Sequence, residues 1–290
     1  MELLSLVNDV VFKIFFTNKA NEHLLIHFLQ TVLEFPEGRL TEVTILNPDL
    51  PKFTADDKGL VVDLYAKTNT GETFHIEMQA QGHTFFKERI ISYNSRAFST
   101  QLTTGSNYNE IQKTISVIIT DFVLIEELRH YHNTFMWRNE DGVLFTNAQQ
   151  IHTLEIPKLP EHPTSDKASW LKLFKAKEAS EMDQVVQDTP MIKQALVSLR
   201  ELSADEKIRE AARVREDALR LQQTIEKSAM RRGMEQGIEQ GIEQGIEQER
   251  QRNELEKLET AKNLLAMGLS AEQVVQVTRL SVAKVRALQK

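Results

Sequence analysis

The chain has 290 residues, of which 41% are hydrophobic, so it is long enough for one large or two smaller domains with a substantial core. It contains no cysteine, which excludes disulfides, thiolate metal ligands and thiol catalysis and fits the reducing cytoplasm. The net charge of −7 argues against a protein that coats nucleic acid through bulk positive charge, but it allows a local basic surface. The sequence shows neither a charged-then-apolar leader nor an apolar run of the ~18 residues that cross a bilayer, so we expect a cytoplasmic protein without membrane contact.

Residues 1–160 combine helix and strand patterns and are expected to form one α/β domain. The elements expected in chain order are an amphipathic helix over 24–33, a two-stranded hairpin over 61–80, a helix with a polar face near 84–102, a buried central strand in "TISVIITDFVLI" from Thr114, and a last short strand in "IHTLEIPKLP" from Ile151.

Residues 161–232 show no strand alternation and are expected to form a helical extension. Thr189 followed by Pro190 is typical of a cap with proline at the first helical position. Ser203 with Glu206 three residues later predicts a capping box that opens a long, charged helix.

Residues 233–253 contain an internal repeat, "GMEQGIEQGIEQGIEQ", with a period of four. Its apolar residues lie on one slowly rotating stripe of a helix. Glycine at every fourth position opposes helix formation by roughly 1 kcal/mol each relative to alanine. The segment is therefore either a marginal helix that needs a partner or a flexible linker, and the sequence favours neither.

Residues 254–290 are expected to form a small domain of short helices. Gly268 is a C-terminal stop signal, Ser270 with Gln273 predicts a capping box, and Ser281 predicts the cap of a last helix. The final twelve residues carry basic side chains and no acids. They fit either a helix-turn-helix that touches DNA or an oligomerisation unit, and the second is favoured because short helical hairpins are common packing units.

The hairpin raises the main functional question. "NTG" at 69–71 is a turn signal, and folding the chain about Thr70 brings the apolar faces together and sets Asp63 opposite Glu77, with Gln79 on the same face. Facing carboxylates destabilise a sheet unless they are solvated or share a cation. Two interpretations follow: a wet polar face on which acids happen to oppose, or a Mg²⁺ or Mn²⁺ site suited to phosphodiester cleavage.

The spacing Asp-x13-Glu-x-Gln, formed by Asp63, Glu77 and Gln79, resembles the PD-(D/E)XK nuclease superfamily. More closely, the chain resembles the recombination-promoting nuclease (Rpn) family, often labelled PD-(D/E)XK family transposases. "NDVVFKIFF" is similar to the opening motif of that family, "IEMQ" to its core strand, and "RIISYNSRAFSTQLTTGSNYNEI" to its following helix and loop. The resemblance covers essentially the whole chain and is most specific over 5–125.

The resemblance implies an α/β fold: a restriction-endonuclease-like (PD-(D/E)XK) core with a mixed sheet flanked by helices, followed by an all-helical C-terminal extension. It implies a Mg²⁺-dependent DNA endonuclease, with Mn²⁺ or Ca²⁺ as alternative ions, linked to DNA recombination, mobile elements or phage defence. The alternative is a catalytically inactive DNA-associated or oligomeric scaffold of the same fold. The C-terminal helices are expected to form a homo-oligomer.

Carried over by position, the resemblance makes Asp63 and Glu77 metal ligands. Gln79 stands where the superfamily more often has lysine, and it can hydrogen-bond the attacking water but brings no positive charge. Asp9 is a candidate further acid of the site. Its alternative is structural, because Asn8 or Asp9 at a helix start is a favourable N-cap.

Four residues are candidates for nucleic-acid contacts. Lys13 lies one helical turn after Asp9, where it would offset the acids or contact phosphate. Arg89, Tyr93 and Arg96 are spaced so that one helix face presents all three, which suits phosphate contacts beside an acidic metal site. The alternative is a solvated helix face.

Overall fold

The computed structural model describes residues 2–46, 49–50, 60–61, 63–82, 84–102, 105–162, 164–183, 185 and 189–288. The chain divides into two compact units, Met1–Ala218 and Leu219–Lys290. Each unit is described by itself below.

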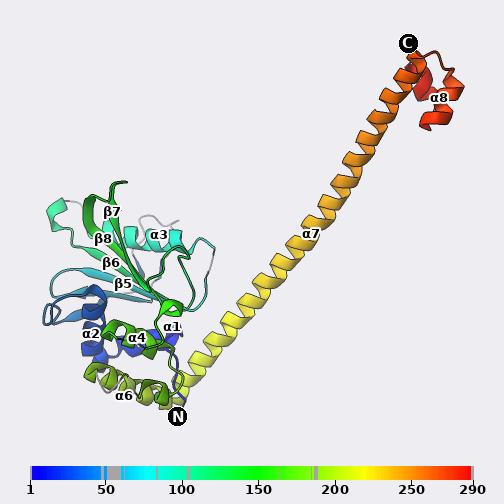
Figure 1. Cartoon of the computed structure of the whole chain (residues 1–290). Coiled ribbons are helices and arrows are strands. Elements are labelled where there is room, and N and C mark those ends of the chain that lie inside the picture. The colour runs from blue at the N-terminus through cyan, green and yellow to red at the C-terminus, as the bar shows by residue number, and fades with distance from the viewer. Residues whose placement is uncertain are drawn as a thin grey trace. The chain divides into compact units, whose positions relative to one another are not determined.

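The first unit is built on a six-stranded sheet with the strand order β1-β4-β5-β6-β8-β7 (Figure 1). Strands β5, β6 and β8 are parallel to one another, and the other three pair antiparallel with their neighbours. Strands β2 and β3 form a separate pair. The strands are β1 (Val43–Leu46), β2 (Asp49–Leu50), β3 (Leu60–Val61), β4 (Leu64–Thr68), β5 (Thr73–Gln79), β6 (Thr114–Thr120), β7 (His132–Arg138) and β8 (Leu144–Glu155).

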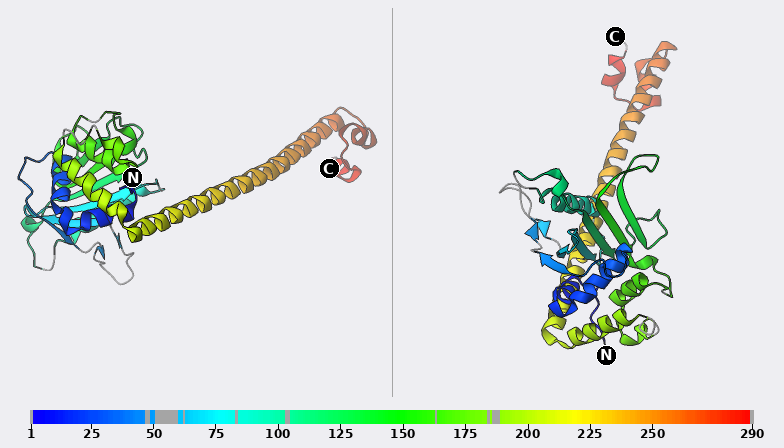
Figure 2. Two further views of the ribbon diagram at one scale, coloured as in Figure 1. Left: turned by 90° about the horizontal axis from the view of Figure 1, so that it is seen from below. Right: turned by 90° about the vertical axis from the view of Figure 1, so that its left-hand side faces the viewer.

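Helices cover both faces of this sheet (Figures 1 and 2). The helices on one face are α1 (Asp9–Thr17), α2 (Glu22–Leu33), α4 (Asp166–Lys175) and α6 (Pro190–Ala204), and the helix on the other is α3 (Phe86–Ser99). Four 3₁₀ turns, at Lys19–Asn21, Tyr108–Glu110, Ile156–Lys158 and Ala179–Met182, complete the described connections. This arrangement is the predicted mixed sheet flanked by helices.

The larger hydrophobic core lies between the sheet and the helices α1, α2, α4 and α6. It joins alternate residues of the strands to a cluster of aromatic rings formed by Phe12, Phe16, Phe28, Trp170 and Phe174. A smaller core under α3 joins Phe86 and Ile90 to Ile118 of the central strand. Helices α4 and α6, from the range expected to form a separate extension, therefore share one core with the strands; the expected boundaries near 160, 232 and 253 remain predictions.

The predicted hairpin and its register are confirmed. Strand β4 pairs antiparallel with β5, and Leu64 lies opposite Ile76 while Ala66 lies opposite Phe74. Gly71 turns the chain with a φ of +94°, a left-handed conformation that favours glycine. Continued by one residue, this register sets position 63 opposite position 77. The adjacent position 62 lies outside the described residues.

The polar face of the hairpin differs from the wet-face interpretation. Helix α3 packs over β5, β6 and β8, so that His75 is 1% and Glu77 6% exposed. Glu77 is therefore a buried charged group, and solvation does not explain why it stands opposite another acid.

The structure tests three other expectations. Strand β6 is central and buried throughout, as predicted. Strand β8 is longer than expected, and it pairs along its length with β7, from Leu144 opposite Arg138 to Leu154 opposite His132; the sequence did not predict β7. The predicted capping box at Ser203 is wrong, because Asp205 caps the helix instead. The Asp205 carboxylate accepts hydrogen bonds from the N–H groups of Lys207 and Ile208, and the Ser203 hydroxyl donates to Leu199 O.

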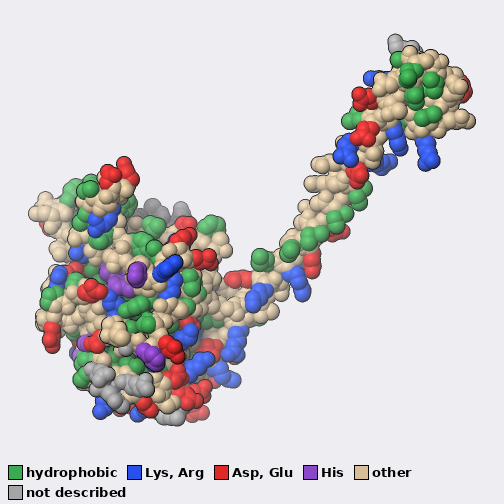
Figure 3. All heavy atoms as spheres, in the orientation of Figure 1, with side chains coloured by type: hydrophobic (Ala, Val, Ile, Leu, Met, Phe, Trp, Pro, Cys, Tyr) green, Lys and Arg blue, Asp and Glu red, His purple; other side chains and the backbone are tan. Residues whose placement is uncertain are grey.

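Helix α7 (Glu206–Ala266) starts in the first unit and continues through the four-residue repeat in the second. The repeat is thus helical in this structure, with exposed Met234, Ile238, Ile242 and Ile246. Hydrophobic side chains follow one side of this helix in Figure 3.

The end of α7 packs with α8 (Ala271–Thr278) and α9 (Val282–Ala287) around a small core that contains Ala261, Val274 and Val285. The predicted capping box at Ser270 and the cap at Ser281 are confirmed. Among the described residues, none of the helices combines the length and apolar character that crossing a bilayer requires.

A polar cluster in which Lys167 and His152 are buried joins β7, β8 and α4. Lys167 Nζ lies 2.7 Å from His132 Nδ1, and His132 Nε2 lies 3.0 Å from His152 Nδ1. Because an ammonium only donates, His132 accepts at Nδ1 and donates from Nε2, which keeps both rings neutral. Burial, with the Lys167 charge nearby, lowers the pKa of His132 to about 4. Burial and the neighbouring His132 lower the pKa of His152 to about 3.

This cluster predicts acid sensitivity. Below the ordinary histidine pKa of 6.5 these two histidines take up protons in the unfolded chain but not in the folded chain, so their contribution to the free energy of unfolding falls as pH drops from 6.5 towards 4. The fall is at most about 1.4 kcal/mol per histidine for each pH unit. Urea unfolding of the metal-free protein between pH 7 and pH 4.5 measures it. His152→Gln should flatten the dependence, and an equal slope in this variant would contradict the assignment.

Candidate active site

Three acids from three segments converge at one end of the β4–β5 hairpin. Asp9 lies in the first turn of α1, Asp63 directly precedes β4, and Glu77 lies near the end of β5. The Met78 N–H donates a hydrogen bond of 2.8 Å to Asp63 Oδ2, which holds this carboxylate against β5. The charges of both Glu77 and Asp9 act on Asp63. The structure thus brings together the three acids that the sequence selected.

The electrostatics of Asp63 are unusual. Burial, and next the negative charge of Glu77, raise the pKa of the Asp63 carboxyl to about 8, although the Met78 N–H and Arg89 oppose the rise. A carboxylate here therefore has too little positive charge around it. A bound divalent cation would supply that charge and reverse the shift.

Glu77 is held by two partners. Arg89 on α3 donates from Nη2 to Glu77 Oε1 at 2.6 Å, and His75 Nε2 lies 3.3 Å from Glu77 Oε2. The same Nη2 lies 3.0 Å from Gln79 Oε1. A guanidinium from the neighbouring helix therefore stands beside Gln79, so the positive charge that glutamine lacks is present at this point of the site.

Tyr93 lies in the same layer as Arg89. Its ring centre is 5.5 Å from that of His75 and 5.7 Å from Arg89 Cζ. Burial raises the pKa of the Tyr93 hydroxyl, so this group is protonated and able to donate. Arg96 is half-buried in the last turn of α3. Arg89 and Tyr93 thus lie beside Glu77 in the candidate site, and Arg96 lies further along the same helix.

The N-cap of α1 is Asn8 and not Asp9, and the role of Asp9 in the site stays a prediction. Asn8 is the N-cap, and its Oδ1 accepts hydrogen bonds from the N–H groups of Val10 and Val11. Asp9 instead forms a bidentate ion pair with Arg215 on α7, with Nε–Oδ1 at 2.8 Å and Nη2–Oδ2 at 2.5 Å. Lys13 is exposed one turn further along α1.

Sequence reasoning missed two residues of this site. His75 was not among the residues selected from the sequence, yet it is buried between Glu77 and Ser116 Oγ, which lies 3.2 Å from His75 Nδ1. Its position two residues before Glu77 on the same strand face was the available signal. Arg215 is separated from Asp9 by 206 residues, and no local pattern connects them.

The residues fit a divalent cation in their chemistry. Two facing carboxylates suit Mg²⁺, which takes one or two protein carboxylates and keeps several waters. The uncompensated charge of Asp63 is the observation that favours a cation. Within the described part of the chain, no three acidic or histidine side chains form a ligand set, and Glu77 and Asp9 are each paired with an arginine. Backbone and water oxygens would complete the shell around Asp63 and Glu77.

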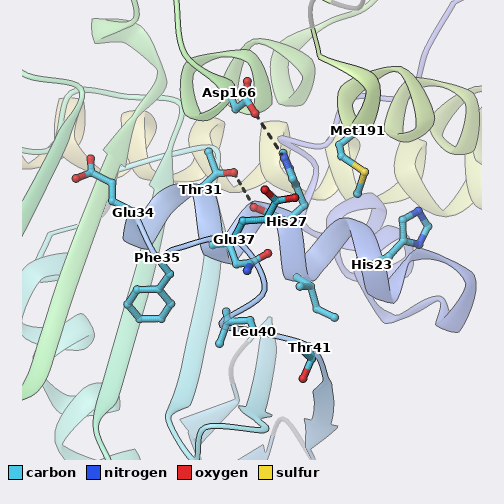
Figure 4. Close-up of a pocket in the computed structure, with 12 residues that line it drawn as sticks. His23, His27, Thr31, Glu34, Phe35, Glu37, Leu40, Thr41, Asp166 and Met191 are labelled. Carbon is cyan, nitrogen blue, oxygen red and sulfur yellow. Dashed lines mark hydrogen bonds and ion pairs between the residues drawn. The ribbon is translucent and has the colours of Figure 1, made fainter.

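A separate pocket of about 680 Å³ lies between α2 and the starts of α4 and α6 (Figure 4). The Nε2 atom of His27 lies 3.5 Å from Asp166 Oδ2, and its Nδ1 atom accepts a hydrogen bond from the Trp170 N–H. Both ring nitrogens are therefore engaged. None of the three converging acids lines this pocket, so it is not part of the candidate site.

A six-stranded mixed sheet between helices, with opposed acids on a central hairpin, is the fold of a PD-(D/E)XK nuclease. The family model of the PD-(D/E)XK nuclease family transposases matches residues 6–228, and the chain belongs to this family. The match includes Asp9, the hairpin and the first turns of α7. Searches of curated proteins and of solved structures gave no match. Membership supports a nuclease or mobile-element role with DNA as the substrate, and proteins of this class typically use divalent metals.

The Arg89–Glu77 contact predicts a stability effect. Arg89→Ala should lower the free energy of unfolding by about 1–3 kcal/mol, because it leaves a buried carboxylate with only His75 as a side-chain partner. Urea denaturation in EDTA measures the change. Lys87→Ala, at an exposed position of the same helix, is the matched control and should stay within about 0.5 kcal/mol of the wild type. An equal loss of unfolding free energy in both variants would contradict a specific role of the Arg89–Glu77 contact.

Proposed function

We propose that this protein is a metal-dependent DNA endonuclease that hydrolyses phosphodiester bonds, acting in DNA recombination, mobile-element movement or phage defence. The observation that carries the proposal is the pair of half-buried Asp63 and buried Glu77, opposed by the hairpin register, with too little positive charge around Asp63. A structural protein gains nothing from such a pair, since facing buried acids destabilise the sheet that holds them.

Asp63 and Glu77 are proposed to hold Mg²⁺, with Mn²⁺ or Ca²⁺ as alternative ions. A metal ion in this position would polarise a phosphoryl oxygen of the DNA and activate a water molecule for attack. Gln79 orients that water by hydrogen bonding, and Arg89, 3.0 Å from Gln79, offsets the negative charge that develops on the phosphate. Asp9 acts as a further acid beside Asp63.

DNA contacts are proposed for the surface around the acids. Tyr93 offers its protonated hydroxyl, while Lys13 and Arg96 offer positive charge on α1 and α3. Contacts of this kind position the backbone and carry no sequence information. Cleavage governed by these residues alone would therefore depend weakly on DNA sequence.

The proposal is tested by plasmid nicking. Wild-type protein should nick supercoiled plasmid with Mg²⁺ and not with EDTA. Asp63→Ala and Glu77→Ala should each lower the rate at least about a hundredfold, since metal stabilisation of a transition state contributes several kcal/mol. Glu88→Ala, an exposed acid on α3, is the matched control and should nick normally. Equal nicking by all variants would point to contamination and favour the inactive scaffold.

We also propose that the repeat helix joins two copies of this chain. Its residues form two adjacent rows along α7: a ridge of Met234, Ile238, Ile242 and Ile246, each 53–67% exposed, and a row of glycines with open space where a Cβ would stand. A ridge of residues four apart packs into the matching groove of a second helix at about −50°. One helix carries both halves of this contact, so a second copy is its natural partner.

The assembly proposal has a direct test. Ile238→Ser with Ile242→Ser should lower the mass measured by light scattering, because the ridge loses its apolar surface. The control, Gln236→Ser with Gln240→Ser, carries similar helix costs on another row of the helix and should keep the wild-type mass. Deletion of residues 233–248 should lower the mass as well. If the mass stays the same after this deletion, the repeat does not join the copies.

A further inference from the structure

The first turns of α7 are anchored beside the acids by two consecutive residues, the N-cap and the first residue of α1. Asn8 Nδ2 donates a buried hydrogen bond of 3.0 Å to Ala212 O, and Asp9 binds Arg215 one turn further along α7. Ala212 is 2% exposed and belongs to the main core. The start of α7 is therefore part of the wall of the site.

Arg215 has donors to spare. A guanidinium carries five N–H groups, and the bidentate pair with Asp9 uses two of them. The side chain is 39% exposed, so a ligand in solvent has access to it. The charge of Asp63 also acts on Arg215, which places this guanidinium at the acid cluster.

The site has more acidic than basic side chains, and Arg215 contributes to the balance of charge. When ionised, Asp9, Asp63 and Glu77 contribute three negative charges, which repel the phosphates of an approaching DNA strand. Arg89 supplies one positive charge at Glu77 and Gln79. Arg215 supplies the second from another element, and Lys and Arg side chains gather around the first turns of α7 in Figure 3.

The ion pair is not the sole anchor of α7, because the buried Asn8–Ala212 contact also holds the start of this helix. A guanidinium fixed on one side by a carboxylate is preorganised for a phosphate on the other, since arginine matches phosphate oxygens bidentately. We propose that Arg215 is a DNA-binding residue of the site, anchored by Asp9, whose remaining N–H groups contact a backbone phosphate. The inference rests on the proposed nuclease function and extends it to the helical extension.

Binding of a labelled DNA duplex, followed by fluorescence anisotropy in EDTA over a range of salt concentrations, tests this proposal without cleavage. Arg215→Ala should weaken binding about tenfold and reduce the slope of log affinity against log salt by about one, as loss of one phosphate contact requires. Arg213→Ala is the matched control: Arg213 also forms a bidentate pair, with Glu210 on its own helix, but it is 70% exposed and away from the acids. It should retain the wild-type affinity and slope.

Two outcomes overturn the proposal: wild-type DNA binding by Arg215→Ala, or equal losses in the Arg215 and Arg213 variants, which would reflect net charge alone. If circular dichroism shows that Arg215→Ala is unfolded, Arg215→Lys replaces it. This variant keeps the charge and should keep the wild-type salt slope while binding DNA a few-fold more weakly. A folded Arg215→Lys protein whose affinity equals that of the wild type would contradict the guanidinium contact.

The nicking assay separates this proposal from the proposed function. If wild-type protein does not nick plasmid with Mg²⁺ but the Arg215 variants bind DNA more weakly, the nuclease function fails and the contact stands. If wild-type protein nicks and Arg215→Ala binds DNA normally, the nuclease function stands and the Arg215 contact fails.

Discussion

The antiparallel pairing of β4 with β5 is the constraint on which the rest of the site depends. It sets Leu64 against Ile76 and Ala66 against Phe74 in the main core, and the same register carries Asp63 to Glu77 on the other side. Each of these acids then requires a positive partner. Arg89 on α3 forms an ion pair with Glu77. The pKa of Asp63 stays raised because the described side chains do not fully compensate its negative charge.

Position 79 shows how a site can keep its electrostatics while changing its residues. Glutamine stands where a lysine is usual in the superfamily, yet Arg89 Nη2 lies 3.0 Å from its oxygen and 2.6 Å from Glu77. The guanidinium is also held over the Phe86 ring at 4.9 Å, which limits its freedom. In the proposed mechanism, charge and water orientation, which one lysine combines in the superfamily, are divided between Arg89 on helix α3 and Gln79 on strand β5.

Sequence reasoning succeeded where the pattern was local. Period-two alternation on both strands and the turn at Gly71 predicted the register, and with it the meeting of Asp63 and Glu77. It failed where polar groups bury one another. Ser116 and Asn94 are hydrogen-bonded beneath α3, with Asn94 Nδ2 2.9 Å from Ser116 Oγ, so a face that looks solvated by composition is in fact covered. Arg215 reaches Asp9 only through the tertiary fold, and the pairing of β7 is interrupted by register shifts near Phe135 and Trp137 that hide its alternation.

Because one register assembles both the core and the acids, the two cannot be lost separately by rearrangement. A slip of one residue would turn Phe74 and Ile76 out of the core at the same time as it parted the carboxylates. If descendants of this sequence lose the proposed nuclease activity, we therefore expect the loss to occur through substitutions of single side chains on an unchanged framework. Decay of the activity would then be visible as point substitutions, long before any drift in architecture.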